Sequence, residues 1–331
     1  MNATYQRDIE HCKVSPYIKE VTITEVLPAQ NSDNLECIKF AEMGWQCVSQ
    51  KGLRQVGQKV MFIPAESVLP FELGEKLEIT TYLSKGRVKV TKLRGNRSEG
   101  LIVERDVIEE YIPSIMKWED LPTKSMMGEF MSPYEISPYM HKFYEMPNIM
   151  NEPFTFDVGE GLMYSEKIHG TNWRVGKLPH PVTENMQLYV GGHETVFKDT
   201  VDNIYLRASR EIEGKLPEGL LFFGEIFGRG IQDLHYDTKF GYRFYAASRK
   251  GVYIHHDELA EICRDLTLPC VQFGTTVFTN LEQIRELAEG QSMYAKHLKE
   301  GVVLASMNNP EKMAKCIGFT YLSRHNKTER H

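Results

Sequence analysis

The sequence predicts an α+β protein with two domains, in which a small β-barrel precedes a larger domain that mixes strands with a few helices. Three observations lead to this prediction. The chain has 331 residues, whereas a single hydrophobic core stops growing at about 250–300 residues. The first hundred residues form short apolar runs between turns, and the second half combines longer apolar runs with two helical patterns.

Short strands fill the first part of the chain. They are separated by polar or glycine-containing connections at 31–34, 51–58 and 94–100. The predicted strands are 17–28, 36–42, 45–50, 59–64, 87–93 and 101–105. About five short strands in under a hundred residues indicate a small barrel, so residues 1–105 are predicted to form an OB-like domain.

The rest of the chain divides at residue 140. Residues 106–140 are rich in Pro, Met and Tyr with little periodicity, which indicates a linker or connector. Residues 141–331 form the predicted second domain. Its expected helices are 201–214 and 280–290, and its expected strands are 186–192, 220–228, 243–248, 251–255 and 301–306.

Composition excludes several classes of protein. Hydrophobic residues make up 41% of the chain and charged residues 25%, as in ordinary soluble globular proteins. No run of about 18 apolar residues predicts a membrane span, and the N-terminus has no apolar signal core. The six cysteines are scattered without a C-x-x-C pair, which argues against zinc sites and disulfides. We expect a cytoplasmic monomer without membrane association.

One basic segment stands out in a chain whose net charge is −6. The stretch KGRVKVTKLRGNR contains no carboxylate, and part of it alternates charged and apolar residues. A solvated strand face explains this pattern, and so does a surface that contacts nucleic-acid phosphates. The candidate nucleic-acid-binding residues are Lys85, Arg87, Lys89, Lys92, Arg94 and Arg97.

Four charged residues of the second domain lie in or beside apolar strands: Lys167, Glu225, Glu300 and Lys315. Ionised groups in such places are costly unless they are paired or used in chemistry. A structural network of ion pairs is one explanation. The other is nucleotidyl transfer, in which a lysine attacks an α-phosphate, carboxylates hold Mg²⁺ and a second lysine contacts the phosphate.

The order of four motifs favours the second explanation. EKIHGTN resembles the Lys-x-x-Gly nucleophile motif of the covalent nucleotidyltransferases, and its His-Gly-Thr-Asn form is similar to that of RNA ligases. FFGEIFG, EGVV and MAKCIGFTYLSR follow in the order that this family shows. The N-terminal half resembles the OB module of the Deinococcus- and Naegleria-type RNA ligases. The resemblance spans most of the chain.

This resemblance implies an ATP-grasp-like nucleotidyltransferase domain of antiparallel sheets with flanking helices. Lys167 would accept AMP as a phosphoramidate, and Lys315 would act with it on the α-phosphate. Glu300 would be the main ligand of Mg²⁺ or Mn²⁺, and Glu225 would support the metal or hold the ribose. The implied ATP contacts are Glu166, Ile168, Asn172, Glu225, Tyr245, Lys312 and Lys315. His169 is either a loop-packing residue or a substrate contact.

Three positions depart from the family pattern. Ala247 and Ser248 stand where relatives carry an aromatic residue that stacks on adenine, followed by an aspartate, so Phe244 or Tyr245 could supply a ring from a shifted position. His193 replaces an arginine, for which Arg174, Lys198 or Arg207 could compensate. Ile317 replaces a lysine, and Lys312 could act in its place.

The resemblance therefore implies an ATP-dependent RNA ligase that joins a 3′-hydroxyl to a 5′-phosphate. Its partners would be nicked RNA duplexes, RNA ends or RNA–DNA hybrids. A DNA ligase or a capping enzyme would use the same nucleophile, but most of these carry their OB domain after the catalytic domain. A nucleic-acid-binding protein with a degenerate nucleotide pocket is the alternative outside enzymes, and Ala247 and Ser248 are its best support.

Overall fold

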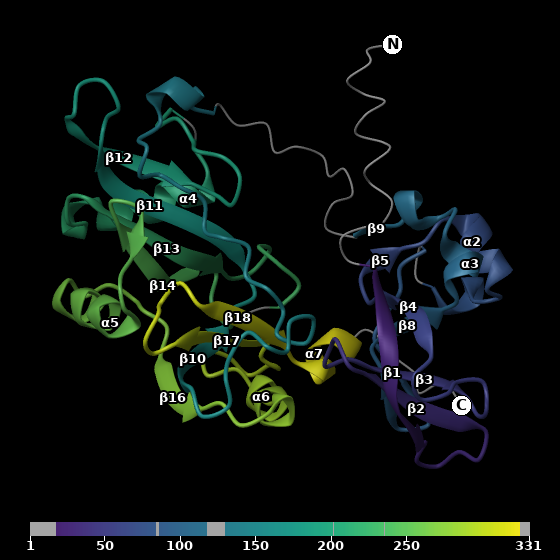
Figure 1. Ribbon diagram of the computed structural model, residues 1–331. Helices are drawn as coiled ribbons and strands as arrows, with labels where there is room; N and C mark the ends of the chain where they lie inside the picture. The colour runs from purple at the N-terminus through teal and green to yellow at the C-terminus, as the bar shows by residue number, and fades with distance from the viewer. Residues whose placement is uncertain (1–17, 84–85, 118–129, 201, 235, 325–331) are drawn as a thin grey trace, which may run out of the picture. The chain divides into compact units, whose positions relative to one another are not determined.

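The computed structural model of the protein describes residues 18–83, 86–117, 130–200, 202–234 and 236–324 (Figure 1). Its contacts divide the chain into two units. Within the described residues, the first unit comprises 18–117 apart from 84–85, together with 150–153 and 322–324. The second unit comprises 130–149 and 154–321 apart from 201 and 235.

A five-stranded antiparallel sheet forms the first unit, with the order β3-β2-β1-β4-β8. Its strands are β1 (Lys19–Pro28), β2 (Leu35–Phe40), β3 (Gln46–Gln50), β4 (Lys59–Pro64) and β8 (Gly100–Val103). The backbone of Gln46 in β3 exchanges hydrogen bonds with Glu99, just before β8, so the sheet curls until its two edges nearly meet. The predicted small barrel is therefore confirmed as a nearly closed sheet.

Shorter elements cover this barrel. Two further antiparallel pairs are present: β5 (Ser67–Val68) pairs with β9 (Met116–Lys117), and β6 (Thr91–Leu93) forms a hairpin with β7 (Asn96–Ser98). The helices are α2 (Phe71–Lys76), η1 (Thr80–Tyr82), α3 (Arg105–Ile108) and η2 (Ile112–Ser114). Ile108, Ile112 and Ile115, which the sequence placed in the connector, lie in the hydrophobic core of this unit.

The predicted strand 87–93 is only partly correct, because the regular strand spans Thr91–Leu93 alone. Before it, the backbone of Val88 bonds to Glu66 and Ser67, beside the short strand β5. The chain then leaves β5 and enters the β6–β7 hairpin. Two different partners therefore divide a stretch that alternation alone predicts as one strand.

Two antiparallel sheets form the second unit. One has the order β16-β10-β17-β18 and contains β10 (Gly161–Lys167), β16 (Phe273–Val277), β17 (Gly301–Ser306) and β18 (Met313–Ile317). The other has the order β12-β11-β13-β14-β15 and contains β11 (Thr171–Pro179), β12 (Met186–Gly191), β13 (Leu220–Phe227), β14 (Gly241–Arg249) and β15 (Val252–Tyr253).

The two sheets share a hydrophobic core. Phe223 and Ala246 of one sheet pack in a cluster with Ala305 and Met313 of the other, and Phe143 adds an aromatic ring. Apolar side chains on the facing strand surfaces therefore hold the sheets together. The site residues described below project from these two sheets.

Helices complete the second unit. They are α4 (Ile204–Ile212), α5 (His256–Asp265), α6 (Leu281–Ala288) and the part of α7 (Phe319–Ser323) up to Tyr321, with short turns η4 (Pro133–Glu135) and η5 (Glu213–Lys215). Leu206 of α4 and Leu259 of α5 are buried against Phe222 and Phe244, so both helices pack on the β13–β14 region (Figure 1). The structure confirms the helices predicted near 201–214 and 280–290. It adds α5, which was not predicted although Leu259 and Cys263 share one face.

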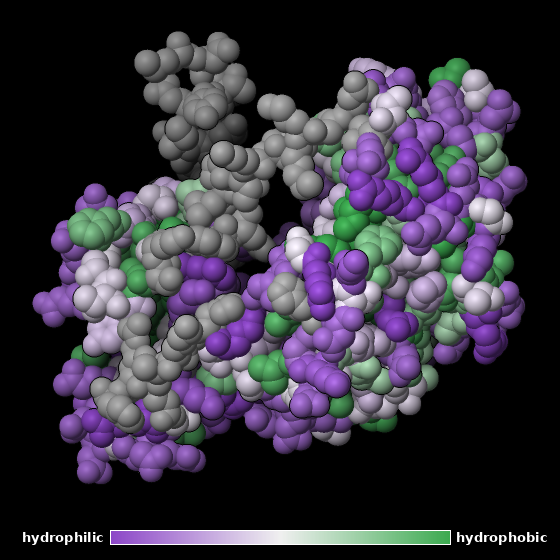
Figure 2. Space-filling view, turned by 180° about the vertical axis from the view of Figure 1, so that it is seen from behind, coloured by the Kyte–Doolittle hydropathy of each residue, from purple (hydrophilic) through white to green (hydrophobic). Residues whose placement is uncertain are grey.

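Hydrophilic residues cover most of the face seen in Figure 2, and apolar residues are scattered among them. No helix among the described residues is long and apolar enough to span a membrane.

Candidate active site

Strand register brings the sequence-predicted lysines to one face of the β16-β10-β17-β18 sheet. Ser165 pairs with Val303, and Val303 pairs with Lys315. Side chains that lie directly opposite one another project from the same face, and so do residues two apart on a strand. Lys167, two residues beyond Ser165, therefore shares a face with Lys315.

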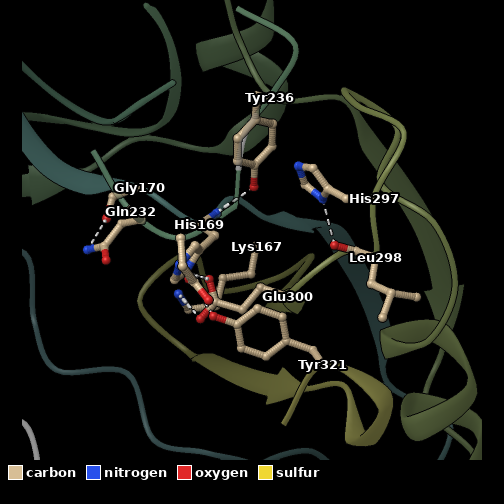
Figure 3. Close-up of polar contacts among 10 residues, drawn as sticks. Lys167, His169, Gly170, Gln232, Tyr236, His297, Leu298, Glu300 and Tyr321 are labelled. Carbon is tan, nitrogen blue, oxygen red and sulfur yellow. Dashed lines mark hydrogen bonds and ion pairs between the residues drawn. The ribbon is translucent and has the colours of Figure 1, made fainter. Parts of the chain in front are cut away.

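Lys167 forms an ion pair with Glu300. Its Nζ lies 2.8 Å from Oε1 of Glu300, and the two side chains are 27% and 12% exposed (Figure 3). Lys167 ends β10, and it lies opposite Gly301, the first residue of β17. Burial favours a raised pKa for Glu300, but Lys167 and His169 outweigh it and hold the pKa below its usual value. Glu300 is therefore an anion at neutral pH.

Glu225 joins this pair from the other sheet. Asn172 and Glu225 lie opposite each other in β11 and β13, so they project from one face. Burial raises the pKa of Glu225 to about 8, while Lys167 lowers this pKa and Glu300 raises it. Glu225 therefore sits close enough to both partners for its charge to depend on theirs.

Glycine is required at two points around these carboxylates. A Cβ atom on Gly170 would overlap the carbonyl oxygen of Ile226 and the side chain of Glu225. A Cβ atom on Gly301 would overlap the carbonyl oxygen of Cys316 in β18. The glycines of the Lys-x-x-Gly and Glu-Gly motifs thus let neighbouring strands approach the site closely.

His169 lies at the centre of a polar network. Its Nε2 is 2.6 Å from Oδ1 of Asp233, and its Nδ1 is 2.9 Å from the hydroxyl of Tyr321 and 3.4 Å from Oε2 of Glu300. Its backbone N–H donates to the hydroxyl of Tyr236 at 2.7 Å. In Figure 3, His169 lies beside Lys167, Glu300 and Tyr321.

Glu166 is almost fully buried, with 5% of its surface exposed. Its Oε2 accepts a hydrogen bond from the backbone N–H of Met293 at 2.7 Å. Its Oε1 is buried and has no hydrogen-bond partner among the described residues. An unsatisfied carboxylate oxygen in such a place is costly, so it is suited to accept a hydrogen bond from a ligand.

A small, mostly apolar pocket adjoins the face that carries Lys167. Its lining includes Ser165, Tyr245, Phe143, Phe273 and Val303. Tyr245 is the extra residue of a β-bulge in β14, because Phe223 pairs with Ala246 and Gly224 pairs with Phe244. A bulge re-aims a side chain.

Polar and aromatic contacts fix Tyr245 in that pocket. The amide of Asn172 donates to its hydroxyl at 2.5 Å, and the ring meets Phe143 edge to face at 5.2 Å. Ala247 is instead buried in the core beneath α4 and α5. Ser248 is also buried, and its hydroxyl lies 2.8 Å from Nε2 of His141.

Two of the predicted ATP contacts, Lys312 and Ile168, make contacts with residues outside the Lys167–Glu300 pair. Lys312 lies just before β18, where its Nζ is 2.7 Å from Oε2 of Glu160, near the start of β10 rather than its Lys167 end. The structure therefore does not bring Lys312 to the cluster around Lys167. Ile168 is buried in a cluster with Phe227 and Tyr236.

The suggested substitutes for the missing arginine also have other contacts. The guanidinium of Arg174 is buried and donates to the carbonyl groups of Gly192, Met140 and Thr195. Arg207 forms an exposed ion pair with Asp202 at 2.8 Å. The N–H donors of Arg174 are therefore used to hold loops in place, and a phosphate would have to compete for them.

The carboxylates of Glu300 and Glu225 fit a hard divalent cation. Oε1 of Glu300 faces Lys167, while its Oε2 is buried and accepts no hydrogen bond from the described residues. Oxygen donors of this kind suit Mg²⁺ and Mn²⁺. No group of three or more His, Cys, Asp or Glu side chains that could hold a metal occurs in the described ranges. A metal bound here would therefore take its other ligands from water and substrate.

The residues of the basic segment lie in different surroundings. Arg87 pairs with Glu66, and burial lowers the pKa of Lys89, as do Arg87 and Arg324. Lys92 and Arg97 lie directly opposite each other in the β6–β7 hairpin, whose turn contains Arg94. Lys85 lies outside the described residues.

Sequence reasoning missed Asp233, Tyr236 and Tyr321 as neighbours of the nucleophile motif, and Met293 as the donor to Glu166. Tyr321 belongs to the quoted motif MAKCIGFTYLSR, and that was the available signal for it. Asp233 and Met293 lie in loops without any spacing that would single them out.

Comparisons with known proteins find matches to the fold and to part of the sequence. Residues 161–317 match the family model for RNA ligase. Structures of Naegleria gruberi RNA ligase are similar in fold. An apo mutant has a TM-score of 0.76 at 20% identity, over 94% of this chain and 98% of that chain. A complex with PPi has a TM-score of 0.76 at 21% identity, over 95% and 100%.

A mutant of the same Naegleria ligase with ATP and Mn also has a TM-score of 0.76, at 19% identity over 94% of this chain and 100% of that chain. No curated protein sequence matches the chain. The region that matches the RNA ligase family model, residues 161–317, contains Lys167, Glu225, Glu300 and Lys315.

Proposed function

We propose that the protein is an ATP-dependent RNA ligase that joins 3′-hydroxyl and 5′-phosphate ends through a covalent lysyl-AMP on Lys167. The observation that carries this proposal is the convergence of Lys167 from β10, Glu225 from β13 and Glu300 from just before β17, with Lys167 and Glu300 at 2.8 Å. The match of residues 161–317 to the RNA ligase family supports RNA as the substrate.

The surroundings of Glu166 and Tyr245 support adenine as the base. The free Oε1 of Glu166 can accept a hydrogen bond from the adenine amino group, while Met293 occupies the other oxygen. The aromatic and apolar lining around Tyr245 and Val303 suits a stacked purine. Tyr245 thus takes the place of the ring that is missing at Ala247.

In the first step, the deprotonated Nζ of Lys167 attacks the α-phosphate of ATP. The N–P bond forms as the bond to the β-phosphate oxygen breaks, and pyrophosphate leaves. Oε1 of Glu300 is within hydrogen-bonding distance to take the lysine proton. Lys315, on the same sheet face, would contact the α-phosphate. Mg²⁺ or Mn²⁺ held by Glu300 and Glu225 would neutralise phosphate charge.

In the later steps, the 5′-phosphate of RNA takes the AMP from Lys167, and a 3′-hydroxyl then displaces AMP from the activated end. Positioning of the two ends supplies most of the rate enhancement in such a reaction. The barrel of the first unit is proposed to be an OB-like domain that binds RNA through its basic segment. Asn172 would orient phosphate or metal-bound water.

The test is labelling with ATP that carries radioactive α-phosphate, in the presence of Mn²⁺ or Mg²⁺. We expect an acid-labile label on the wild type and on Lys215→Ala, a control lysine that contacts the carbonyl of Thr267. Lys167→Ala should carry no label but should still join RNA that is already adenylated.

Three outcomes would replace the proposal. Label from GTP and none from ATP would favour a capping-type enzyme. A folded wild-type protein that takes label from no nucleotide and seals no adenylated RNA would favour a nucleic-acid-binding protein. Sealing of nicked DNA in preference to nicked RNA would favour a DNA ligase.

A further inference from the structure

Residues 290–299 form a loop between α6 and β17. The backbone N–H of Met293 in this loop donates to Oε2 of Glu166 at 2.7 Å, and Tyr294 beside it packs on the cluster that contains Ile168. Met293 therefore occupies one oxygen of Glu166, and the buried Oε1 is the oxygen left for a ligand. The position of this loop decides how Glu166 is presented.

Arg243 of β14 reaches the loop through Tyr294. Its guanidinium carbon lies 4.2 Å from the centre of the Tyr294 ring, which is a cation–π contact. Its Nη1 donates to the carbonyl group of Cys270 at 3.0 Å. The hydroxyl of Tyr294 accepts the backbone N–H of Gln272 at 2.8 Å. The guanidinium and the ring are thus both tied to the segment that leads into β16.

Strand register places Arg243 on the sheet face that carries the site. It pairs directly with Glu225 of β13, and residues that lie opposite each other project from the same face. Burial raises the pKa of Tyr294, whereas the backbone N–H of Gln272 and the charge of Arg243 lower it. Glu166 raises this pKa as well. Tyr294 is therefore close to both Arg243 and Glu166.

The guanidinium of Arg243 also has an unsatisfied donor. Its Nε is buried and has no hydrogen-bond partner among the described residues. A buried donor without a partner costs free energy, and an apolar side chain of similar length would avoid this cost. An arginine at this position therefore calls for an explanation other than stability.

We propose that Arg243 and Tyr294 are positioning residues that hold the 290–299 loop, so that Met293 occupies Oε2 of Glu166 and only Oε1 meets the amino group of the nucleobase. This inference rests on the proposed function for the identity of the base. The contacts that hold the loop do not depend on it. Because the two residues act through Glu166, their loss should raise the KM for ATP and leave kcat nearly unchanged.

The first experiment measures amide hydrogen exchange of Met293 in the protein without nucleotide. Arg243→Met keeps a long side chain but removes the guanidinium, and Tyr294→Leu removes the ring. Each should speed exchange at Met293 by at least about tenfold. Tyr294→Phe keeps the cation–π contact and should speed it less. Arg249→Met is the matched control in the same strand, because this arginine forms an exposed ion pair with Glu258.

The second experiment compares ATP with purine riboside triphosphate, which lacks the amino group, in the labelling of Lys167. The wild type should have a KM for ATP at least about tenfold lower, since one hydrogen bond to a charged group is lost with the analogue. Arg243→Met and Tyr294→Leu should raise the KM for ATP toward that of the analogue and change the KM for the analogue little.

Two further variants show whether the residues act together. Arg243→Lys keeps the charge but not the planar stack on the ring, so its preference for ATP should be intermediate. Arg243→Met combined with Tyr294→Leu should lose no more preference than either single variant, because both act through one contact. Arg243→Lys and Tyr294→Phe carry the same two tests if a larger change prevents folding.

The outcomes separate this inference from the proposed function. Slow exchange of Met293 in folded Arg243→Met and Tyr294→Leu would overturn the positioning role. So would an equal rise of the KM for ATP and for the analogue, since the loss would then not involve the amino group. A wild type that takes label from no nucleotide would contradict the proposed function alone, because exchange at Met293 would still decide whether Arg243 and Tyr294 hold the loop.

Discussion

The ammonium of Lys167 and the carboxylate of Glu300 form a 2.8 Å ion pair in which both side chains are largely withdrawn from solvent. Removal of one partner from a buried pair leaves an uncompensated charge, which costs more than the pair contributes. Lys167→Met should therefore lower the free energy of unfolding by about 3 kcal/mol. Lys167→Met combined with Glu300→Gln should recover at least about 1 kcal/mol of this loss.

Chemical denaturation of the two single variants and the double variant checks this coupling. Lys39→Met with Glu25→Gln is the matched cycle, because this ion pair at 3.1 Å is about half exposed. Its coupling should be below about 1 kcal/mol. Equal coupling in the two cycles would mean that the buried pair is no more important for stability than a surface pair.

Glu225 makes stability depend on pH in the opposite direction to an ordinary ion-paired carboxylate. Burial raises its pKa from 4.5 to about 8. Between these pH values the folded protein binds a proton that the unfolded chain has lost, so the free energy of unfolding falls as the pH rises. The slope from this group is at most about 1.4 kcal/mol per pH unit, and it vanishes above pH 8.

Glu225→Gln should flatten this decline, measured as melting temperature between pH 5 and pH 8 in the presence of a chelator. The lowered pKa of Glu300 affects stability in a different pH range. Its stabilising contribution is lost only as the pH falls below the usual carboxyl range. Glu72→Gln, at an exposed carboxylate of α2, should leave the wild-type profile unchanged. An identical decline in Glu225→Gln would show that another group causes it.

Gly170→Ala and Gly301→Ala should both be strongly destabilising. In each case the new methyl group meets a backbone carbonyl oxygen of the adjacent strand, which cannot rotate away. A cost of about 2–3 kcal/mol is expected for such overpacking. Gly214→Ala, where no atom lies within 4 Å of the added Cβ, should cost little or stabilise slightly. Thermal unfolding of the three variants checks this prediction. If the cost comes from the close approach of the neighbouring strand, only Gly170→Ala and Gly301→Ala should lower the melting temperature.

The sequence could predict the residues of the site far better than the contacts that orient them. Lys167 and Gly170 belong to one short motif, and Glu300 begins another, so their order along the chain was sufficient to predict that they meet. Asp233 lies 64 residues from His169, and Met293 lies 127 residues from Glu166. No local period connects such pairs, because only the packed sheets bring them together.

The position of Tyr245 shows that the irregularities of a strand are also difficult to predict from the sequence. Alternation predicted the strand at 243–248 but not its bulge, which re-aims Tyr245 toward the pocket and leaves Ala247 in the core. A bulge depends on the partner strand, here β13, whose register shifts between Phe223 and Gly224. The strand at 87–93 was over-extended for a similar reason, since two different partners pair with its two halves.

Glu166→Gln should reduce the preference for ATP. The amide oxygen of the new side chain can accept from Met293, which turns its NH₂ group toward the site of the free Oε1. That donor would oppose the adenine amino group, so the KM for ATP in lysyl-AMP formation should rise by about 10–100-fold. Label from GTP should increase relative to label from ATP. Glu211→Gln, on the exposed face of α4, should change neither value.

The hairpin of β6 and β7 carries Lys92, Arg94 and Arg97, and bound RNA phosphates would reduce the repulsion between these side chains. Lys92 and Arg97 lie directly opposite each other, and like charges in such pairs are destabilising. Arg94 and Gly95 both have positive φ, as in the tight turn that joins two such strands. A phosphate bound between these side chains would neutralise their repulsion.

Lys92→Gln, Arg97→Gln and Arg94→Asn should therefore each weaken RNA binding to a similar extent for all sequences. The slope of log K against log salt should fall by about 1 for each variant, because one phosphate contact is lost. Asn at position 94 tolerates the positive φ of the turn, so the hairpin should stay folded. Lys76→Gln, at an exposed ion pair with Glu110, should leave the slope unchanged. A slope that does not change in any of the three hairpin variants would place RNA on another surface of the barrel.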